Sequence, residues 1–293
     1  MTPGSTAIFL NEGAGSAGTD RVRRTVELAR HALDADLHVT ATRDPAEFRA
    51  WLDERIDGYT TAIIAGGDGS LGVAYNVAAP RRELTLGYIP AGFGNATAHL
   101  LRLPKETDAL VEILARREAR PVDLVSVDGR LALFAGAGWD ALVAGRYADA
   151  GARRLPGWAA AVARSVPDLW RRPRIEVRAN GWVVHRGPME MLVVGTTPFY
   201  GRGLKVNPGA RPDAGRLSLR VYPGPAARLA IEAGRWAIGA RPHAERVDAA
   251  RIEVSSLDGS LIPLQADGDV IDARQEWTFE IQPAAVRLIG RWS

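Results

Sequence analysis

Two short glycine-rich stretches with few side chains could bind phosphate groups. The first, residues 66–70 (Gly-Gly-Asp-Gly-Ser), follows a β-branched run, and the second, residues 92–95 (Gly-Phe-Gly-Asn), follows another strand-like run. Glycines allow successive backbone N–H groups to converge on an anion at the start of a helix. One such stretch alone is more often an ordinary tight turn, but two of them after two strands favour a binding site.

Asp68 is the only charged side chain in the first stretch. A carboxylate beside a phosphate repels it, unless a divalent cation lies between them or the carboxylate transfers a proton. The sequence therefore indicates phosphoryl chemistry with Asp68 in a catalytic role. The alternative is a surface aspartate in a plain turn.

The composition excludes several other chemistries. The chain contains no cysteine, which rules out disulfides, thiolate metal sites and a cysteine nucleophile. Its five histidines are not spaced as metal ligands or as part of a catalytic triad. The start of the chain lacks a basic leader, and no apolar run approaches the roughly 20 residues that span a bilayer. We therefore expect a soluble, cytoplasmic protein.

Strands that alternate with helices must position the glycine-rich stretches in the first part of the chain. Four runs are predicted to be strands: residues 5–11, 37–42, 61–66 and 84–89. Thr19 and Asp44 can cap the helices that follow the first two runs, and Pro45 suits a first helical position. This alternation predicts a mostly parallel sheet covered on both faces, with ligands at the carboxyl ends of its strands.

From Val122 onwards the chain is predicted to form mainly strands, interrupted by helices. These are residues 122–127, 131–135, 175–178, 191–194, 217–221, 252–254 and 277–281. Several of them alternate apolar and polar residues, as half-buried antiparallel strands do. We therefore expect an α/β nucleotide-binding domain at residues 1–120 and a β-rich domain at residues 121–293, whose last strand is a candidate to return to the first domain.

Five motifs in chain order resemble those of the diacylglycerol kinase catalytic-domain family, which includes bacterial soluble lipid kinases and the sphingosine kinases. They are Asn11-x-Gly-x-Gly15, Gly66-Gly-Asp-Gly-Ser70, Pro90-x-Gly-x-Gly-Asn95, Ala137-Gly-Trp-Asp140 and Ala266-Asp-Gly-Asp269. Each motif is weak alone, but their shared order covers essentially the whole chain. The resemblance implies a parallel-sheet nucleotide-binding domain, a β-sandwich-like lipid domain, ATP as phosphate donor and dependence on Mg²⁺.

The resemblance also assigns roles to individual residues. The ATP-binding set would be Asn11, Gly13, Gly15, Thr42, Gly66, Gly67, Gly69, Ser70, Gly92, Gly94 and Asn95. Asp267 and Asp269 occupy the family's Asp-Gly-Glu motif, whose last acid is taken as the base that accepts the proton of the lipid hydroxyl. Asp140 would lie near the lipid headgroup, although it could equally cap a helix. Asp213 is a weak candidate for a metal ligand, and a turn residue before Gly215 is the favoured alternative.

Several residues depart from the family pattern. Phe93 stands where bacterial members have a threonine that contacts the nucleotide, and Ala96 stands where many have an aspartate. Asp269 is one methylene shorter than the family's glutamate, so it must be held closer to the hydroxyl. These changes leave fewer polar groups in the second glycine-rich stretch.

Residues 145–174 are the predicted membrane-facing segment. Six residues fall at helical spacing on one side: Trp158, Ala161, Val162, Ser165, Val166 and Leu169. Six arginines cluster around it: Arg153, Arg154, Arg164, Arg171, Arg172 and Arg174. Pro167 should divide the segment into two short helices. An interfacial helix and a helix packed on the β-rich domain both fit this pattern. The glycine-rich residues 195–203 are predicted to form a mobile loop, or else ordinary turns.

Three functions remain open at this point. The first is an ATP- and Mg²⁺-dependent lipid kinase that phosphorylates diacylglycerol or a related lipid at a membrane surface, with peripheral membrane association. The second is a small-molecule kinase of the NAD kinase type, and the third is a non-catalytic protein that binds lipid or nucleotide. No nucleic-acid partner is expected. The sequence identifies neither the lipid nor the oligomeric state.

Overall fold

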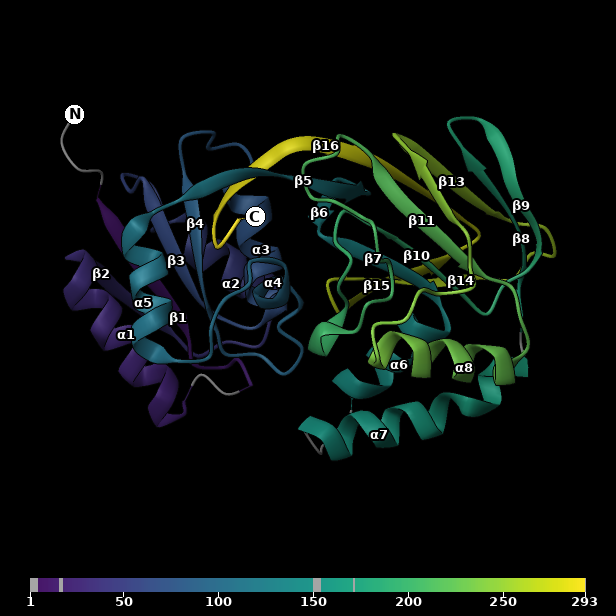
Figure 1. The fold of residues 1–293 in the computed structure, drawn as a ribbon, viewed down its shortest axis with the longest axis horizontal. Coiled ribbons are helices and arrows are strands. Elements are labelled where there is room, and N and C mark those ends of the chain that lie inside the picture. The colour runs from purple at the N-terminus through teal and green to yellow at the C-terminus, as the bar shows by residue number, and fades with distance from the viewer. Residues whose placement is uncertain (1–4, 16–17, 150–153, 171, 293) are drawn as a thin grey trace. The chain divides into compact units, whose positions relative to one another are not determined.

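The computed structural model describes residues 5–15, 18–149, 154–170 and 172–292 (Figure 1). By its internal contacts the chain divides into two compact units. The first unit contains the described residues up to Val122, the short segment Gly201–Gly203 and the end of the chain from Ala284. The second unit contains Asp123–Tyr200 and Leu204–Pro283.

The first unit is built on a parallel sheet with the strand order β2-β1-β3-β4. Its strands are β1 (Thr6–Asn11), β2 (Asp36–Thr40), β3 (Thr61–Gly66) and β4 (Thr85–Pro90). The end of the long strand β16 (Glu276–Ile289) pairs with β4 in the parallel sense, through Arg287 and Leu288. Strands β1 and β3 are buried along their whole length, as expected for a parallel sheet covered on both faces.

Helices cover both faces of this sheet. They are α1 (Asp20–Leu33), α2 (Pro45–Asp53), α3 (Asp68–Ala78), α4 (Ala96–Leu100) and α5 (Thr107–Arg116). Ile8 of β1 belongs to the core formed with α1 and α5. The next residue, Phe9, points to the opposite face, where its ring lies 5.8 Å from that of Trp51 in α2. The alternation of strand side chains thus separates the two helical layers.

The predicted helix caps differ in outcome. The Asp44 side chain accepts a hydrogen bond from the Ala46 N–H at 2.8 Å, and Pro45 is the first residue of α2, as predicted. Thr19 occupies the N-cap position of α1, but its side chain makes no capping hydrogen bond. Both predicted helix starts are therefore confirmed, and a side-chain capping hydrogen bond is formed in α2 but not in α1.

The second unit contains a six-stranded antiparallel sheet with the order β12-β11-β10-β7-β14-β15. Its strands are β7 (Phe134–Gly138), β10 (Met191–Gly195), β11 (Leu217–Tyr222), β12 (Arg246–Ala249), β14 (Ile262–Ala266) and β15 (Asp269–Arg274). Opposite it lie β8 (Arg174–Ala179), β9 (Trp182–Pro188), β13 (Arg251–Ser256), the first part of β16, and the hairpin of β5 (Ala119–Val127) and β6 (Arg130–Ala132). Buried side chains of both layers share one core, which is a β-sandwich arrangement.

Helices cover the outer face of the six-stranded sheet in the second unit (Figure 1). They are α6 (Trp139–Ala148), α7 (Arg154–Ser165), the 3₁₀ turn Val166–Trp170 that contains Pro167, and α8 (Ala226–Ala237). Leu169, Leu229 and Trp236 pack with Met191 and Tyr222 of the sheet.

The strand predicted at residues 131–135 is interrupted in the structure. It is divided between β6 and β7 because the N–H groups of Leu133 and Phe134 both donate to the carboxylate of Asp267 at 3.1 Å.

Candidate functional site

The first glycine-rich turn joins β3 to α3 in the first unit. Gly66 ends the strand and Asp68 starts the helix. The Asn11 Nδ2 donates to Ser70 Oγ at 3.2 Å, and the Gly13 N–H donates to Asn11 Oδ1 at 3.0 Å. Three of the predicted ATP-binding residues from two different turns are thus brought together at the carboxyl end of the sheet.

The two predicted glycine turns touch through their backbones. A Cβ on Gly92 would lie 2.7 Å from the Gly67 Cα, closer than side-chain carbons approach backbone atoms. The Ala91 N–H also donates to the Gly66 carbonyl at 2.7 Å. A third turn approaches in the same way, because a Cβ on Gly13 would lie 2.3 Å from the Thr42 carbonyl oxygen. Glycine is required at these positions because the turns leave no room for side chains.

Asp68 connects the two turns through its carboxylate. Its Oδ2 accepts the Ala96 N–H at 3.0 Å, and its Oδ1 accepts the Thr97 N–H at 3.3 Å. Desolvation raises the pKa of Asp68 to about 6, although these backbone hydrogen bonds act to lower it. Asp68 therefore holds the start of α4 against the start of α3, and its carboxylate takes up a proton at a higher pH than an ordinary aspartate does.

Asn95 shapes the second turn from within. It has a left-handed backbone with a φ of 48°. Its Oδ1 accepts the Gly92 N–H and the Tyr88 hydroxyl, both at 3.0 Å, and its Nδ2 donates to the Gly92 carbonyl at 2.9 Å. Asn95 thus fixes the shape of the turn that presents Gly92 and Gly94.

A buried polar cluster in the second unit contains Asp140, the predicted lipid-headgroup residue. Asp140 lies in the first turn of α6, and its Oδ2 accepts hydrogen bonds from the Tyr200 hydroxyl and the Gln265 Nε2, both at 3.1 Å. The other oxygen, Oδ1, is buried and has no hydrogen-bond partner among the described residues. Desolvation raises the pKa of Asp140 to about 7, and the hydrogen bonds from Gln265 and Tyr200 oppose this rise.

Tyr200 and Gln265 were not predicted as site residues. Tyr200 lies in the glycine-rich stretch of residues 195–203, and its ring packs on Phe134 with 4.1 Å between the ring centroids. Gln265 lies two residues before the Asp267 motif. Proximity to those two stretches was the only sequence signal for either residue.

Asp267 and Asp269 have different surroundings in the turn between β14 and β15. Asp267 is buried and has a φ of 49°. Its carboxylate accepts the N–H groups of Leu133 and Phe134 at 3.1 Å. Asp269 is partly exposed and forms an ion pair with Arg130 at 2.7 Å. Of the two, Asp269 is the one that an incoming molecule could reach.

Asp213 lies on an exposed loop, where both of its carboxylate oxygens are 3.1 Å from the guanidinium of Arg211. No group of three or more His, Cys, Asp or Glu side chains that could hold a metal ion occurs in the described parts of the chain. Asp213 is therefore not accompanied by a set of protein ligands there.

Some residues of the predicted membrane-facing segment are buried in the second unit and others are exposed. Ala161, Ser165 and Leu169 are buried, whereas Trp158 and Trp170 are 37% and 72% exposed. Arg153 and Arg171, which belonged to the predicted arginine cluster, lie outside the described residues. None of the helices in the described ranges has both the length and the apolar character that crossing a bilayer requires.

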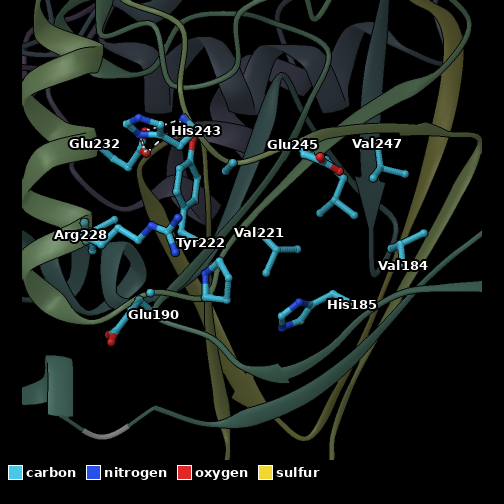
Figure 2. Close-up of a pocket in the computed structure, with 15 residues that line it drawn as sticks. Val184, His185, Glu190, Val221, Tyr222, Arg228, Glu232, His243, Glu245 and Val247 are labelled. Atoms are coloured by element: carbon cyan, nitrogen blue, oxygen red, sulfur yellow. Dashed lines mark hydrogen bonds and ion pairs between the residues drawn. The ribbon is translucent and has the colours of Figure 1, made fainter.

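A separate cavity of about 280 Å³ lies in the second unit, beside α8 and the end of β11 (Figure 2). The ion pair of Glu232 with His243, 2.7 Å between Oε1 and Nδ1, lies on one side of it, and Val184 and Val247 lie on the other. The described residues that line it include none of the predicted site residues.

Two family models match the chain. The diacylglycerol kinase catalytic domain matches residues 5–127, and the YegS C-terminal NAD kinase beta sandwich-like domain matches residues 134–290, more than half of the chain. Two curated relatives carry the name probable lipid kinase YegS-like. The one from Pseudomonas aeruginosa is 28% identical over 282 residues, covering 93% of this chain and 90% of the relative. The one from Stenotrophomonas maltophilia is 27% identical over 291 residues, covering 93% and 92%.

Solved structures share the fold. A diacylglycerol kinase from Bacillus anthracis matches with a TM-score of 0.74 at 20% identity, covering 99% of each chain. An NAD kinase from Archaeoglobus fulgidus in complex with ATP matches with a TM-score of 0.53 at 15% identity, covering 97% of this chain and 92% of that one. These matches confirm the predicted architecture, a parallel-sheet α/β domain followed by a β-sandwich-like domain.

Proposed function

Because the chain belongs to the diacylglycerol kinase catalytic-domain family and resembles lipid kinases along its length, we propose that it transfers the γ-phosphate of ATP to a hydroxyl of diacylglycerol or a related lipid. The observation that most supports this proposal is the pair of glycine turns joined by Asp68. Backbone N–H groups without side chains in front of them are suited to phosphate oxygens. In phosphoryl transfer the protein acts mainly by positioning the two substrates and by neutralising the charge of the phosphates.

Mg²⁺ fits this site as a companion of the phosphates. A Mg²⁺ ion bound with a nucleotide needs only one or two carboxylates from the protein. Asp68 would supply one, because it is the acid of the first glycine turn. When bound, the ion would neutralise charge on the phosphate oxygens.

The acceptor hydroxyl must lose a proton as it attacks the γ-phosphorus. The new P–O bond forms to the lipid oxygen, the bond from the γ-phosphorus to the bridging oxygen breaks, and ADP leaves. We assign the proton to Asp269, because its carboxylate is partly exposed, whereas Asp267 is buried and accepts two backbone N–H groups. Asp267 would support this turn by holding residues 133 and 134.

The lipid headgroup would bind at Asp140. Its unpartnered Oδ1 can accept a hydrogen bond from a hydroxyl, and Tyr200 and Gln265 hold the carboxylate in place. The exposed Trp158 and Trp170 would lie against the membrane that carries the lipid, as a peripheral contact of a cytoplasmic protein.

A small-molecule kinase is the second candidate. The likeness of the fold to an NAD kinase structure favours it, although at 15% identity that likeness concerns the fold alone.

The test is phosphate transfer from labelled ATP, with Mg²⁺, to a panel of lipids in mixed micelles and to NAD as a water-soluble acceptor. We expect labelled lipid from the wild type, and from Asp269→Asn at least about 100-fold less, the minimum typical of a general base, with unchanged ATP affinity. Asp272→Asn is the matched control, because Asp272 is an exposed acid in the same strand.

Three results would contradict parts of the proposal. Transfer to NAD and not to lipid would favour the small-molecule kinase. ATP binding without any transfer would favour a binding protein. Full activity of Asp269→Asn would remove Asp269 as the base.

A further inference from the structure

The segment Gly201–Gly203 brings an arginine to the second glycine turn. Although it comes from the later part of the sequence, this segment groups by its contacts with the first unit. The Arg202 N–H donates to the Gly94 carbonyl at 2.6 Å. The central carbon of its guanidinium, Cζ, lies 4.8 Å from the centroid of the Phe93 ring. Arg202 is thus fixed to the turn by its backbone and by its side chain.

The backbone of Arg202 is unusual for a residue with a side chain. Its φ is 63°, in the left-handed region that glycine adopts without steric cost, and glycines flank it on both sides. A non-glycine residue in this conformation costs of order 1 kcal/mol or more. The contact with Phe93 offsets part of that cost, because a cation–π contact at an exposed site contributes about 0.5–1 kcal/mol.

Arg202 is an exposed cation beside the second glycine turn. It has no ion-pair partner among the described residues. Asp68 is the acid of the neighbouring turn, and both of its oxygens accept backbone N–H groups. A Cβ on Gly94 would lie 3.1 Å from Asp68 Oδ2 and 3.3 Å from the Gly201 Cα, so these three residues meet at one point.

Stacking on Phe93 orients the guanidinium for a phosphate. The Cζ of the guanidinium lies over the ring of Phe93. The five N–H donors of an arginine lie in the plane of the guanidinium, at its edges. A bidentate pair with phosphate oxygens uses those edge donors. Because the stack restricts the side chain before a ligand arrives, less conformational entropy is lost on binding.

We propose that Arg202 binds the polyphosphate of a nucleoside triphosphate at the second glycine turn, and that Phe93 positions it. This inference rests on the proposed function, because it concerns the same nucleotide site. It also accounts for Phe93, which stands where bacterial members of the family have a threonine. The guanidinium beside the ring would supply the polar contact that phenylalanine cannot make.

The test compares the binding of ATP, inorganic tripolyphosphate and adenosine by calorimetry. Arg202→Met keeps the aliphatic stem and loses the charge. We expect it to weaken ATP and tripolyphosphate about 10- to 100-fold, the range for hydrogen bonds to a charged group, and to leave adenosine unchanged. Arg202→Lys keeps the charge and loses the paired N–H donors of the planar guanidinium. Its affinity for ATP and tripolyphosphate should lie between those of Arg202→Met and the wild type.

Two further variants serve as controls. Arg202→Gly relaxes the left-handed backbone, so it should fold at least as well as the wild type and still lose the phosphate affinity. Arg82→Met removes an exposed arginine that precedes β4, whereas the turn follows that strand, and should change nothing.

The outcomes separate this inference from the proposed function. Wild-type affinity for ATP and tripolyphosphate in Arg202→Met and Arg202→Gly would overturn the role of Arg202 and leave the kinase standing. An equal loss of adenosine would also overturn it, because a phosphate contact does not act on the nucleoside. If the wild type bound none of the phosphate compounds, both the nucleotide site and the role of Arg202 would be wrong.

Discussion

Asp68 in the first unit and Asp140 in the second are partly buried residues whose carboxyl groups have raised pKa values, but they are held in different ways. Desolvation raises the pKa to about 6 for Asp68 and to about 7 for Asp140. Asp68 accepts a backbone N–H on each oxygen, from Ala96 and Thr97. Asp140 accepts side-chain donors on one oxygen only, and its Oδ1 has no hydrogen-bond partner among the described residues.

This difference separates an acid that positions a neighbouring turn from an acid with an unsatisfied oxygen. A carboxylate that accepts backbone N–H groups from another segment determines where that segment lies. A buried oxygen without a donor costs free energy until a ligand supplies one. We therefore expect substitutions at the two positions to affect different properties.

The largest effect is expected from Asp68→Ala. The substitution leaves the buried N–H groups of Ala96 and Thr97 without an acceptor, at a cost of about 1–3 kcal/mol for each group. Turnover should be abolished and the free energy of unfolding lowered by about 2 kcal/mol or more. Urea denaturation and the lipid kinase assay measure the two quantities. A stable but inactive variant would mean that Asp68 acts in the chemistry without holding the turn.

A smaller effect, confined to the acceptor, is expected from Asp140→Asn. The amide has nearly the same shape, so the fold should keep at least its wild-type stability while the KM for lipid rises about tenfold or more through loss of a charged acceptor. The affinity for ATP should not change. Asp213→Asn, on an exposed loop of the same unit, is the control. Weaker ATP binding in Asp140→Asn would remove the distinction between the two acids.

The smallest effect is a dependence of stability on pH. Because the pKa of Asp140 is about 7 in the folded protein and the model value is 3.8, the folded state binds the proton more tightly. Its contribution to stability is therefore greatest at low pH and is lost as the pH rises from about 4 to about 7. Asp68, with a folded pKa of about 6, acts with the same sign.

Thermal denaturation between pH 5 and pH 8 checks this sign. The melting temperature of the wild type relative to Asp140→Asn should fall across that range and level off above about pH 7, where Asp140 is ionised. Asp140→Asn should retain the dependence that comes from Asp68. Parallel profiles for the two proteins would show that Asp140 is not the protonated acid.

Local sequence was sufficient for those parts of the fold that depend on neighbouring residues. The β-branched runs at residues 61–66 and 84–89 are strands, and Asp44 with Pro45 starts a helix. The sequence also identified the glycine turns, since their composition alone excludes side chains from them. The catalytic and binding roles of the predicted site residues stay predictions.

Contacts between distant residues could not be predicted in this way. Gln265 and Asp140 are separated by 125 positions, and Tyr200 and Asp140 by 60. The interruption of the strand at residues 131–135 depends on Asp267, which lies 134 positions after Leu133. No local pattern around Leu133 indicates that its N–H will find a carboxylate instead of a neighbouring strand. Strand β9 was missed because three of its consecutive apolar residues, Trp182–Val184, are exposed and do not alternate.

The first unit is assembled from three separate stretches of the chain, which restricts how the gene can be cut and recombined. A fragment that ends at Val122 would lack Gly201–Gly203, and with it Arg202, and it would also lack the end of β16 that pairs with β4. Recombination that exchanges the second half of the gene for that of a relative would therefore also exchange part of the proposed nucleotide site. The two halves of this protein are expected to have been inherited as a pair, and a chimera that exchanges the whole second unit should be joined at four places instead of one.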